Sequence, residues 1–450
     1  MRQSGVTMSI RKSTLAILGM WAVASVVLLT TTVSPVLPRA GILVGGIDFD
    51  TYRDGARHLV GGLPLYAGRL VHDNLYTYPP FSTLVFVPLW WLPRGVGHYI
   101  WMGVNLVALV AIIALCWRIL GYTVTRLVVA ASALMALGCT FVEPVRSTLY
   151  YGQINLILLL LVLWDTSRGK HSRLKGIGVG VAAGIKLTPA YFVAYYMALR
   201  QWRPAAVSVA TLAATVALGW IATASDSWKY WSATFYDDHR VAATPLHQAN
   251  QSLRGMIGRI QGGLPPKGPG GPMAATVPST WVWLVACAGV VIVSMTVVAL
   301  LYRFGERLLA VTLAGLSSLV VSPFSWAHHW VWVVPLFVYL VHRALSNHWW
   351  WVGVAALFLL LGAWPYRYPA DRAPRIGLYL FPDRWVSWYA LVNLYVVLYA
   401  VVLFGAAVLA VRKARPRLPR QDPFDRRDDL GRVGLGARPE ALDHLPSRGE

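Results

Sequence analysis

Apolar residues recur along the chain in long runs, and short polar segments rich in arginine and lysine separate them. About 20 apolar residues in a helix cross a bilayer. Runs approaching that length predict about ten membrane crossings. They lie at Thr14–Val36, Ile100–Ile119, Arg126–Thr140, Ile154–Trp164, Ala205–Ile221, Trp281–Tyr302, Leu308–Val321, Trp330–His342, Trp350–Ala363 and Ser387–Val411.

Two further apolar stretches do not fit a simple crossing. Phe81–Pro93 is short, and we interpret it as re-entrant or interfacial. Gly176–Leu199 is interrupted by Pro189, which removes a helical hydrogen bond and disfavours helix at Thr188. A re-entrant pair of short helices fits this stretch, and a kinked crossing is the simpler alternative.

The positions of basic residues predict the orientation, because short cytoplasmic connections carry an excess of lysine and arginine. Arg2, Arg11 and Lys12 place residues 1–13 in the cytoplasm, and basic clusters between later runs mark further cytoplasmic turns. Residues 37–80, 223–280 and 364–385 then form large extracytoplasmic loops. Residues 412–450 are polar and predict a flexible cytoplasmic tail, so both termini are inside.

Composition supports a membrane protein. Of the 450 residues, 56% are hydrophobic and 13% charged, whereas soluble domains carry about 25% charged residues. The net charge of +21 comes from short clusters between apolar runs, so we do not predict nucleic-acid binding. Cys116, Cys139 and Cys287 lie inside apolar runs and predict packing rather than a disulfide or metal framework. The expected fold is an all-α polytopic membrane protein in the plasma membrane, with about 10–12 transmembrane helices within residues 14–411.

The first outer segment carries two carboxylates, Asp48 and Asp50, just after a predicted crossing. Desolvation at the membrane boundary raises the pKa of a carboxylate, which suits a general base, although a solvated acidic turn has the same sequence. The segment ends at Tyr78-Pro79-Pro80, a rigid aromatic entry into the membrane that suits a sugar or lipid groove.

Other polar clusters lie at predicted outer ends of crossings. His328 and His329 titrate near neutral pH and can donate hydrogen bonds to a phosphate or sugar, or simply anchor at the interface. Adjacent histidines diverge on a helix, so zinc is poorly supported and we expect no metal or other cofactor. Arg146 suits an anionic headgroup. Gln248 and Asn250 suit sugar recognition.

Lys186 interrupts an apolar run, where an ionisable residue is costly and usually functional. It approaches from the predicted cytoplasmic side, so we do not assign it to the chemistry.

Five motifs occur in order and together resemble glycosyltransferase family 87, the polytopic α-mannosyltransferases of mycobacteria and their relatives, with the GT-C fold. They are Asp48-Phe49-Asp50-Thr51-Tyr52, Tyr78-Pro79-Pro80, Gly152-Gln153-Ile154-Asn155, Gly184-Ile185-Lys186-Leu187-Thr188-Pro189 and Ser325-Trp326-Ala327-His328-His329-Trp330. The resemblance extends over about residues 14 to 411, and each motif alone is short.

The resemblance implies a function at the extracytoplasmic face. Such enzymes take mannose from a polyprenyl-phosphate carrier and add it to a membrane glycolipid, such as a phosphatidylinositol mannoside, lipomannan or lipoarabinomannan. Their catalytic aspartate lies in an Asp-x-x-x-Tyr setting, which Asp48 and Tyr52 match here. Asp50 departs from the family pattern and stays a second candidate for the base. The expected reaction is a single inverting displacement, with the leaving phosphate stabilised by His328, His329 and Arg146. Further candidates for substrate binding are Tyr52, Arg53, Tyr78, Gln153, Gln248 and Asn250.

Two other classes of protein remain as alternatives. A lipid or sugar transporter places its site near the midplane between discontinuous helices, and the break at Lys186 is the one such feature here. A non-catalytic scaffold would have no evident use for the outer motifs. The sequence leaves open the acceptor, the linkage, an arabinofuranose donor and the oligomeric state.

Overall fold

The computed structural model describes residues 10–33, 45–169, 171–237, 240–241, 245–262, 279–367, 374–381 and 388–414. Most of the predicted tail and parts of all three predicted outer loops lie outside these residues. The described chain is mainly helical. Its α-helices are α1 (Lys12–Leu28), α3 (Ile47–Val60), α4 (Phe81–Trp91), α5 (Arg94–Ile119), α6 (Arg126–Cys139), α7 (Glu143–Tyr151), α8 (Asn155–Thr166), α9 (Ile177–Ile185), α10 (Phe192–Ala198), α11 (Trp202–Ala222), α12 (Ala224–Ser232), α13 (Leu253–Gly262), α14 (Thr280–Arg303), α15 (Arg307–Val321), α16 (Val333–Ser346), α17 (Trp350–Leu361), α18 (Trp388–Val392) and α19 (Leu394–Ala414).

Shorter helical turns and one small sheet complete the described chain. A π-helical segment, Leu29–Val33, extends α1. The 3-10 turns are η2 (Val71–Asp73), η3 (Thr188–Tyr191), η4 (Thr234–Tyr236), η6 (Ala327–Trp332) and η7 (Leu378–Leu380). Strands β1 (Pro365–Arg367) and β2 (Pro374–Ile376) pair antiparallel in the third predicted loop. This hairpin is a small departure from the expected all-α fold.

The structure confirms a polytopic helical membrane protein. Within the described residues, five helices are long and apolar enough to cross a bilayer: Lys12–Thr31, Arg94–Ile119, Trp202–Ala222, Thr280–Arg303 and Leu394–Ala414. A sixth crossing results if α7 and α8, which are bent by 117° at their junction, count as one span.

Several predicted crossings are shorter helices than expected. Helix α6 has 14 residues and α17 has 12. At 1.5 Å per residue, a 14-residue helix extends for about 21 Å, whereas the hydrocarbon core is about 30 Å thick. The expected number of about ten crossings therefore exceeds what helix length alone supports in the described chain. The run expected to start a crossing at Trp330 instead begins with η6, and its α-helix starts at Val333.

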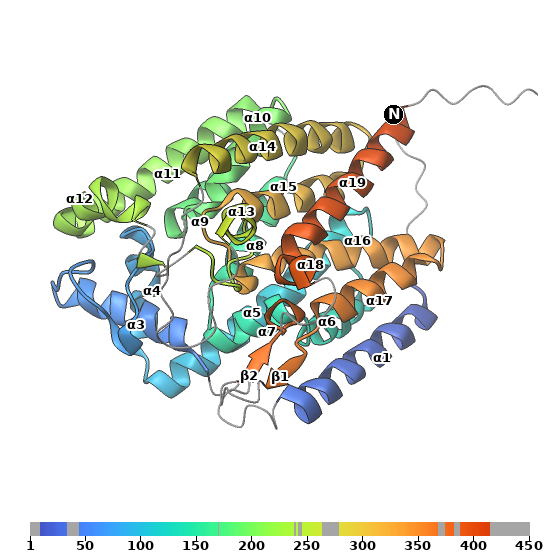
Figure 1. Ribbon diagram of the computed structural model, residues 1–450, viewed down its shortest axis with the longest axis horizontal. Helices are drawn as coiled ribbons and strands as arrows, with labels where there is room; N and C mark the ends of the chain where they lie inside the picture. The colour runs from blue at the N-terminus through green and yellow to red at the C-terminus, as the bar shows by residue number, and fades with distance from the viewer. Residues whose placement is uncertain are drawn as a thin grey trace, which may run out of the picture.

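The helices form a bundle with two distinct ends (Figure 1). Helices α3, α4 and α12 lie at one end, and α16, α17 and the last turns of α19 lie toward the other. Helix α1 lies along one edge, where it packs on α6, and α11 and α14 lie along the opposite edge.

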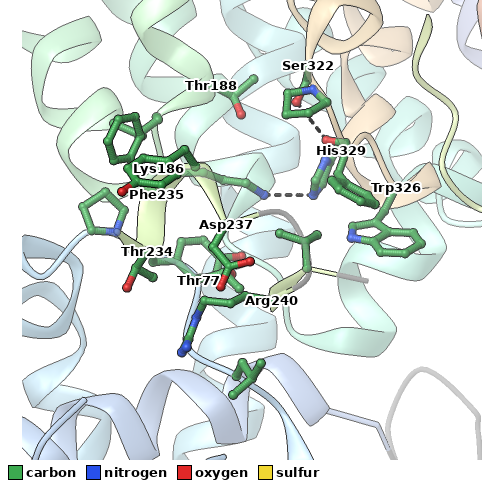
Figure 2. Close-up of a pocket in the computed structure, with 18 of the residues that line it drawn as sticks. Thr77, Lys186, Thr188, Thr234, Phe235, Asp237, Arg240, Ser322, Trp326 and His329 are labelled. Carbon is green, nitrogen blue, oxygen red and sulfur yellow. Dashed lines mark hydrogen bonds between the residues drawn. The ribbon is translucent and has the colours of Figure 1, made fainter. Parts of the chain in front are cut away.

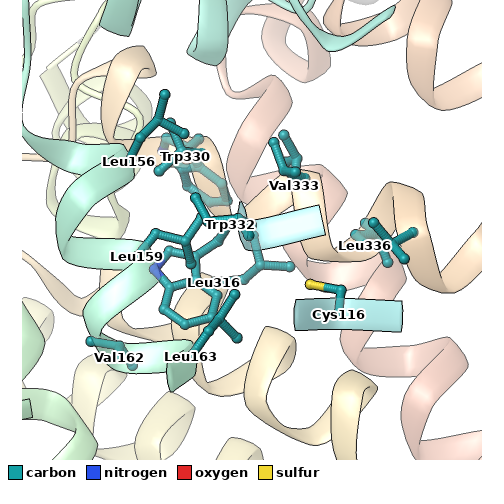
Figure 3. Close-up of a cluster of buried hydrophobic side chains, with 14 of the residues drawn as sticks. Cys116, Leu156, Leu159, Val162, Leu163, Leu316, Trp330, Trp332, Val333 and Leu336 are labelled. Atoms are coloured by element: carbon teal, nitrogen blue, oxygen red, sulfur yellow. The ribbon is translucent and has the colours of Figure 1, made fainter. Parts of the chain in front are cut away.

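A buried apolar cluster between α5, α8, α15 and α16 forms the centre of the bundle (Figure 3). Trp330 and Trp332 of η6 are inserted into it, so the segment is anchored directly after the two histidines. Cys116 belongs to this cluster. The three cysteines are free thiols, in agreement with the predicted packing role.

The predicted break at Lys186 is present. Helix α9 ends at Ile185, Lys186 is extended (φ −148°, ψ 128°), and η3 and α10 continue the chain. Gly184 lies against Thr215 of α11 so closely that a Cβ at position 184 would overlap the threonine side chain. Small residues allow such close approach of helices in membranes. This contact fixes the end of α9, directly before Lys186, against α11.

Candidate active site

Asp48 and Asp50 lie in the first turn of helix α3, where carboxylates are favourable beside the positive end of the helix dipole. Two residues along an α-helix correspond to a rotation of about 200°, so the two carboxylates point to nearly opposite sides. Tyr52 is four residues after Asp48 and lies on the same face. The helical geometry thus separates the two candidate bases that the sequence left open.

A tight turn between α7 and α8 brings Gln153 to Asp48. Gly152 ends α7 in the left-handed conformation (φ 72°), and a Cβ there would lie 2.7 Å from the Cβ of Phe49 on α3. Only glycine allows both this conformation and this approach without strain. As a result, Nε2 of Gln153 donates a hydrogen bond of 2.6 Å to Oδ2 of Asp48.

Two tyrosines orient the amide of Gln153. The hydroxyl groups of Tyr52 and Tyr78 donate to its Oε1 at 3.0 and 3.2 Å. Because the amide oxygen accepts both bonds, the amide NH₂ group faces Asp48. Tyr52 is buried behind the site, and its ring stacks on Phe86 of α4 with a centroid distance of 4.3 Å.

Asp48, Tyr78, Gln153, His328 and His329 line one cavity of about 680 Å³. This volume is in the usual range for small-molecule sites, roughly 300–1,000 Å³. The wall includes aromatic side chains from separate segments, among them Phe235, Trp283 and Trp326. Figure 2 shows this cavity, with Lys186 and His329 facing each other across a hydrogen bond.

Lys186 lines this cavity, contrary to the prediction that excluded it. Its Nζ lies 3.0 Å from Oδ1 of Asn155 and 3.0 Å from Nε2 of His329. The prediction was wrong because it inferred the position of Lys186 from the two ends of the apolar stretch Gly176–Leu199, both of which were expected on the cytoplasmic side. The break after Ile185 instead turns the side chain toward the cavity that Asp48 lines.

The backbone of the histidine segment is fixed by α7 and α8. Thr148 and Asn155 both donate to the carbonyl oxygen of His328, at 3.0 and 2.9 Å. Asn155 therefore holds the histidine segment and Lys186 together. Asp48, His328 and His329 therefore line the same cavity.

The environment shifts the acidities of these groups. Burial raises the pKa of Asp48 to about 6, although the Gln153 hydrogen bond and the charge of Lys186 oppose this rise. Burial, and in second place the charge of Lys186, lowers the pKa of His329 well below its ordinary value, and His328 is affected in the same way. The two histidines are therefore neutral at physiological pH. Burial also lowers the pKa of Lys186 to about 7, although the charge of Asp48 opposes this fall, so Lys186 is partly protonated near neutral pH.

Asp50 does not line the cavity. Its carboxylate accepts hydrogen bonds from Arg94 at 2.8 Å and from His72 at 3.0 Å. Burial acts to raise the pKa of Asp50, but the bonds and charges of Arg94 and His72 outweigh it and the pKa is lowered. A carboxylate with a guanidinium partner, a second hydrogen-bond partner and a lowered pKa is suited to holding α3 on α5 rather than to accepting a proton.

Five other predicted site residues, Tyr52 among them, do not line this cavity either. Arg53 donates to the carbonyl oxygens of Leu89 and Leu92 and ties α3 to the end of α4. The guanidinium of Arg146 is buried on α7 over the ring of Tyr150, at 4.5 Å. The expectation that Arg146 holds the donor phosphate at this cavity is therefore corrected.

The amide cluster of the second predicted loop is structural. The side chain of Asn250 donates to the carbonyl oxygens of Pro245 and Pro323, and its Oδ1 accepts from the backbone of Ser325. It thereby secures the segment that leads to the histidines. The carbonyl oxygen of Gln248 accepts from Gln251.

Four charged residues that line the cavity were not among the predicted site residues: Lys186, Asp237, Arg240 and Arg254. Asp237 and Arg240 lie near each other at the cavity in Figure 2. Arg240 also donates to the carbonyl oxygens of Tyr66 and Tyr76, which joins the second predicted loop to the first. No motif marks these two residues, and only contacts between the loops reveal them. Within the described chain, no group of three or more histidine, cysteine, aspartate or glutamate side chains is placed to hold a metal ion.

The sequence of this chain is similar to those of known glycosyltransferases. Residues 76–323 match glycosyltransferase family 87. A polyprenol-phosphate-mannose-dependent α-(1-2)-phosphatidylinositol pentamannoside mannosyltransferase of Mycolicibacterium smegmatis is 36% identical over 309 residues, which is 67% of this chain and 70% of that protein. A polyprenol-phosphate-mannose-dependent α-(1-2)-phosphatidylinositol mannoside mannosyltransferase of Mycobacterium tuberculosis is 32% identical over 305 residues, 64% of this chain and 68% of that protein.

More distant relatives include an α-(1→3)-arabinofuranosyltransferase of Mycolicibacterium smegmatis, 31% identical over 131 residues, 28% of this chain and 30% of that protein. No solved structure matches. The family match covers more than half of the chain, and the mannosyltransferase relatives extend over about two thirds of it. The chain is therefore a member of glycosyltransferase family 87.

Proposed function

We propose that the chain transfers mannose from polyprenol-phosphate mannose to a phosphatidylinositol mannoside or a related cell-envelope glycolipid, with Asp48 as the general base. The observation that carries this proposal is the position of Asp48. Its carboxylate lines a cavity of suitable size, is held by Gln153, has a pKa raised to about 6, and shares the cavity with Lys186 and two histidines.

The charges around the cavity suit a phosphate-linked donor. Lys186, Arg240 and Arg254 line it together with Asp48 and Asp237, so cations outnumber carboxylates among the described lining residues. Trp283 also lines it, and Trp283 lies in the first turn of the membrane-spanning helix α14. A donor with a sugar phosphate in the cavity and a polyprenyl tail in the bilayer fits this position at the membrane boundary.

The proposed reaction is a single displacement at the anomeric carbon. The acceptor hydroxyl oxygen attacks this carbon, its proton passes to the carboxylate of Asp48, and the bond from the anomeric carbon to the phosphate oxygen breaks. The electron pair of that bond leaves with polyprenyl phosphate. A β-linked donor then gives an α-mannoside. Lys186, with the neutral donors His328 and His329, stabilises the leaving phosphate in place of Arg146.

We place the site on the extracytoplasmic side and both termini in the cytoplasm. The arrangement of lysine and arginine between the apolar runs supports this orientation. Residues 37–80, 223–280 and 364–385 then form the outer loops of one catalytic domain, residues 14–411. Mannose is favoured over arabinofuranose as the donor sugar, because the mannosyltransferase relatives cover about twice as much of this chain as the arabinofuranosyltransferase relatives.

The decisive experiment compares Asp48→Asn with Asp50→Asn. A general base contributes about 10²–10⁴-fold, so Asp48→Asn is expected to lower mannose transfer by that factor. Asp50→Asn is expected to keep the rate of mannose transfer within about tenfold of the wild-type rate. The Asp50 carboxylate binds Arg94 and so positions helix α3, and it takes no part in the proton transfer. The assay measures mannosylated glycolipid by mass spectrometry, in membranes supplied with polyprenol-phosphate mannose.

Folding is checked by expression level and by melting in detergent. An active Asp48→Asn enzyme beside an inactive, folded Asp50→Asn enzyme would move the base to Asp50. Full activity in both variants would reject the proposed mechanism.

A further inference from the structure

A second hollow lies in the part of the bundle away from α3 and α4, between helices α15, α16, α17 and α19 (Figure 1). It has a volume of about 510 Å³ and walls of leucine, valine, alanine and glycine. Arg343 and Arg412 are the only charged side chains among the described residues that line it. None of its lining residues belongs to the cavity at Asp48.

The shape of this groove suits a hydrocarbon chain. It follows α19 from Leu398 to Arg412, 14 residues or about 21 Å at 1.5 Å per residue. Its walls are apolar along this length, as the environment of a lipid tail requires.

Two glycines form part of the groove wall. A Cβ at Gly405 of α19 would meet nothing within 4 Å, and a Cβ at Gly353 of α17 would meet only Leu340, at 4.0 Å. Neither glycine is needed for close packing of this chain on itself. They leave bare helix backbone toward the groove, where a lipid chain can lie.

One end of the groove is cationic. Arg343 and Arg412 lie in the last turns of α16 and α19. The guanidinium of Arg343 donates to the hydroxyl of Tyr339 at 3.2 Å and lies 5.1 Å from the ring of Trp350. Tryptophan collects at the level of lipid headgroups.

The counter-charge at this end is incomplete. Glu306 lies 3.9 Å from Arg343 and also pairs with Lys413. The described groups at this end are therefore Arg343, Arg412 and Lys413 against one carboxylate, Glu306. Among the described residues, this end of the groove therefore carries a positive excess.

We infer that this groove binds an anionic phospholipid, with an acyl chain along α19 and the phosphate group at Arg343 and Arg412. The site is separate from that of the polyprenyl donor. Arg343 is ten residues beyond Val333 on α16, about 15 Å further from the histidine turn that precedes this helix. Basic pockets between membrane helices are typical sites for anionic headgroups.

The test uses the full chain in nanodiscs that contain equal amounts of phosphatidylglycerol and phosphatidylcholine with the same acyl chains. Native mass spectrometry after mild extraction counts the lipids that stay bound. The wild-type protein is expected to retain phosphatidylglycerol preferentially. A basic residue near an anionic lipid contributes about fivefold, so Arg343→Gln with Arg412→Gln is expected to reduce the preference by up to about 25-fold.

Matched variants separate charge from groove volume. Arg126→Gln with Arg200→Gln removes two exposed arginines that do not line the groove, and the preference is expected to persist. Gly353→Leu with Gly405→Leu fills the groove and is expected to lower retention of both lipids. Gly289→Leu is the control, because Gly289 also has open space around its Cβ position but lies on α14.

Equal retention of both lipids by the wild-type protein would overturn the inference, as would an unchanged preference after removal of both arginines. A dimer that the groove-filling variants convert to a monomer would show instead that a second copy covers the groove. Lipid retention and oligomeric state do not depend on glycosyl transfer, so these measurements test the lipid site independently of the proposed enzymatic function.

Discussion

Gln153 donates a hydrogen bond of 2.6 Å to Asp48, although the two residues are 105 positions apart in the sequence. Asp48 belongs to the helix after the first crossing, and Gln153 belongs to the turn between α7 and α8. This bond stabilises the charged form of a carboxylate that burial would otherwise protonate. The acidity of the proposed base is therefore a balance between burial, which raises its pKa, and the amide of Gln153 and the charge of Lys186, which lower it.

The first prediction concerns the pH dependence of transfer. Asp48 must be deprotonated to accept the acceptor's proton, and its pKa is about 6. We expect kcat/KM to fall by about tenfold per pH unit below this pKa, and to fall again above about pH 7, where Lys186 loses the proton with which it stabilises the leaving phosphate. Initial rates of mannose transfer between pH 5 and 8 measure this profile. A rate that is constant down to pH 5 would contradict the raised pKa.

The second prediction concerns Gln153→Leu. Loss of the amide removes a bond that lowers the pKa of Asp48, so the pKa is expected to rise above about 6. The acid limb of the profile should shift to higher pH, and activity should fall more at pH 6 than at pH 8. Gln248→Leu changes a glutamine that does not line the cavity and is expected to leave the profile unchanged. A uniform loss at every pH would show a role other than control of acidity.

The third prediction concerns Lys186. Removing a group that stabilises developing negative charge costs about 10²–10³-fold in kcat. Lys186→Met is expected to lose activity by that order, and Lys186→Arg is expected to recover part of it. The matched control, Lys229→Met, removes an exposed lysine of α12 and should retain wild-type rates. Kinetics at varied donor concentration measure the effect, and a fully active Lys186→Met enzyme would exclude the proposed role.

The fourth prediction concerns the packing that positions Lys186. Gly184→Val is expected to destabilise the protein by about 1–3 kcal/mol, because the new side chain overlaps Thr215 of α11. Thermal melting in detergent measures the loss. Adding Thr215→Ala should restore part of the stability by removing the overlapped atoms. If the double variant melts no higher than Gly184→Val alone, the contact between α9 and α11 is not the cause.

Much of the architecture could be predicted from local sequence. The helical membrane fold, the break at Lys186 and the membership of glycosyltransferase family 87 were all predicted and confirmed. The number of membrane crossings was not confirmed. A run of apolar residues does not show where an α-helix is replaced by a 3-10 turn. At Ala327–Trp332 that change occurs inside one apolar run.

The candidate site, like the fold, could be predicted from the sequence only in part. Local motifs identified Asp48, Tyr78, Gln153, His328 and His329, which line one cavity. Arg146, Arg53 and Asn250 carry similar chemical groups, but they bind the protein's own rings and carbonyl oxygens. A side chain's type does not reveal which partner it meets, so these residues looked equally suitable in the sequence.

The sequence by itself determined the medium in which this protein folds, since runs of apolar residues are stable as helices in lipid and basic residues between them favour one orientation. Only the tertiary structure decided between Asp48 and Asp50 as the residue that faces the cavity. The physical reason is the rotation of the helix, which turns one carboxylate to Gln153 and the other to Arg94. The structure also brought Lys186 to the same cavity, through a break whose direction depends on the packing of α9 against α11.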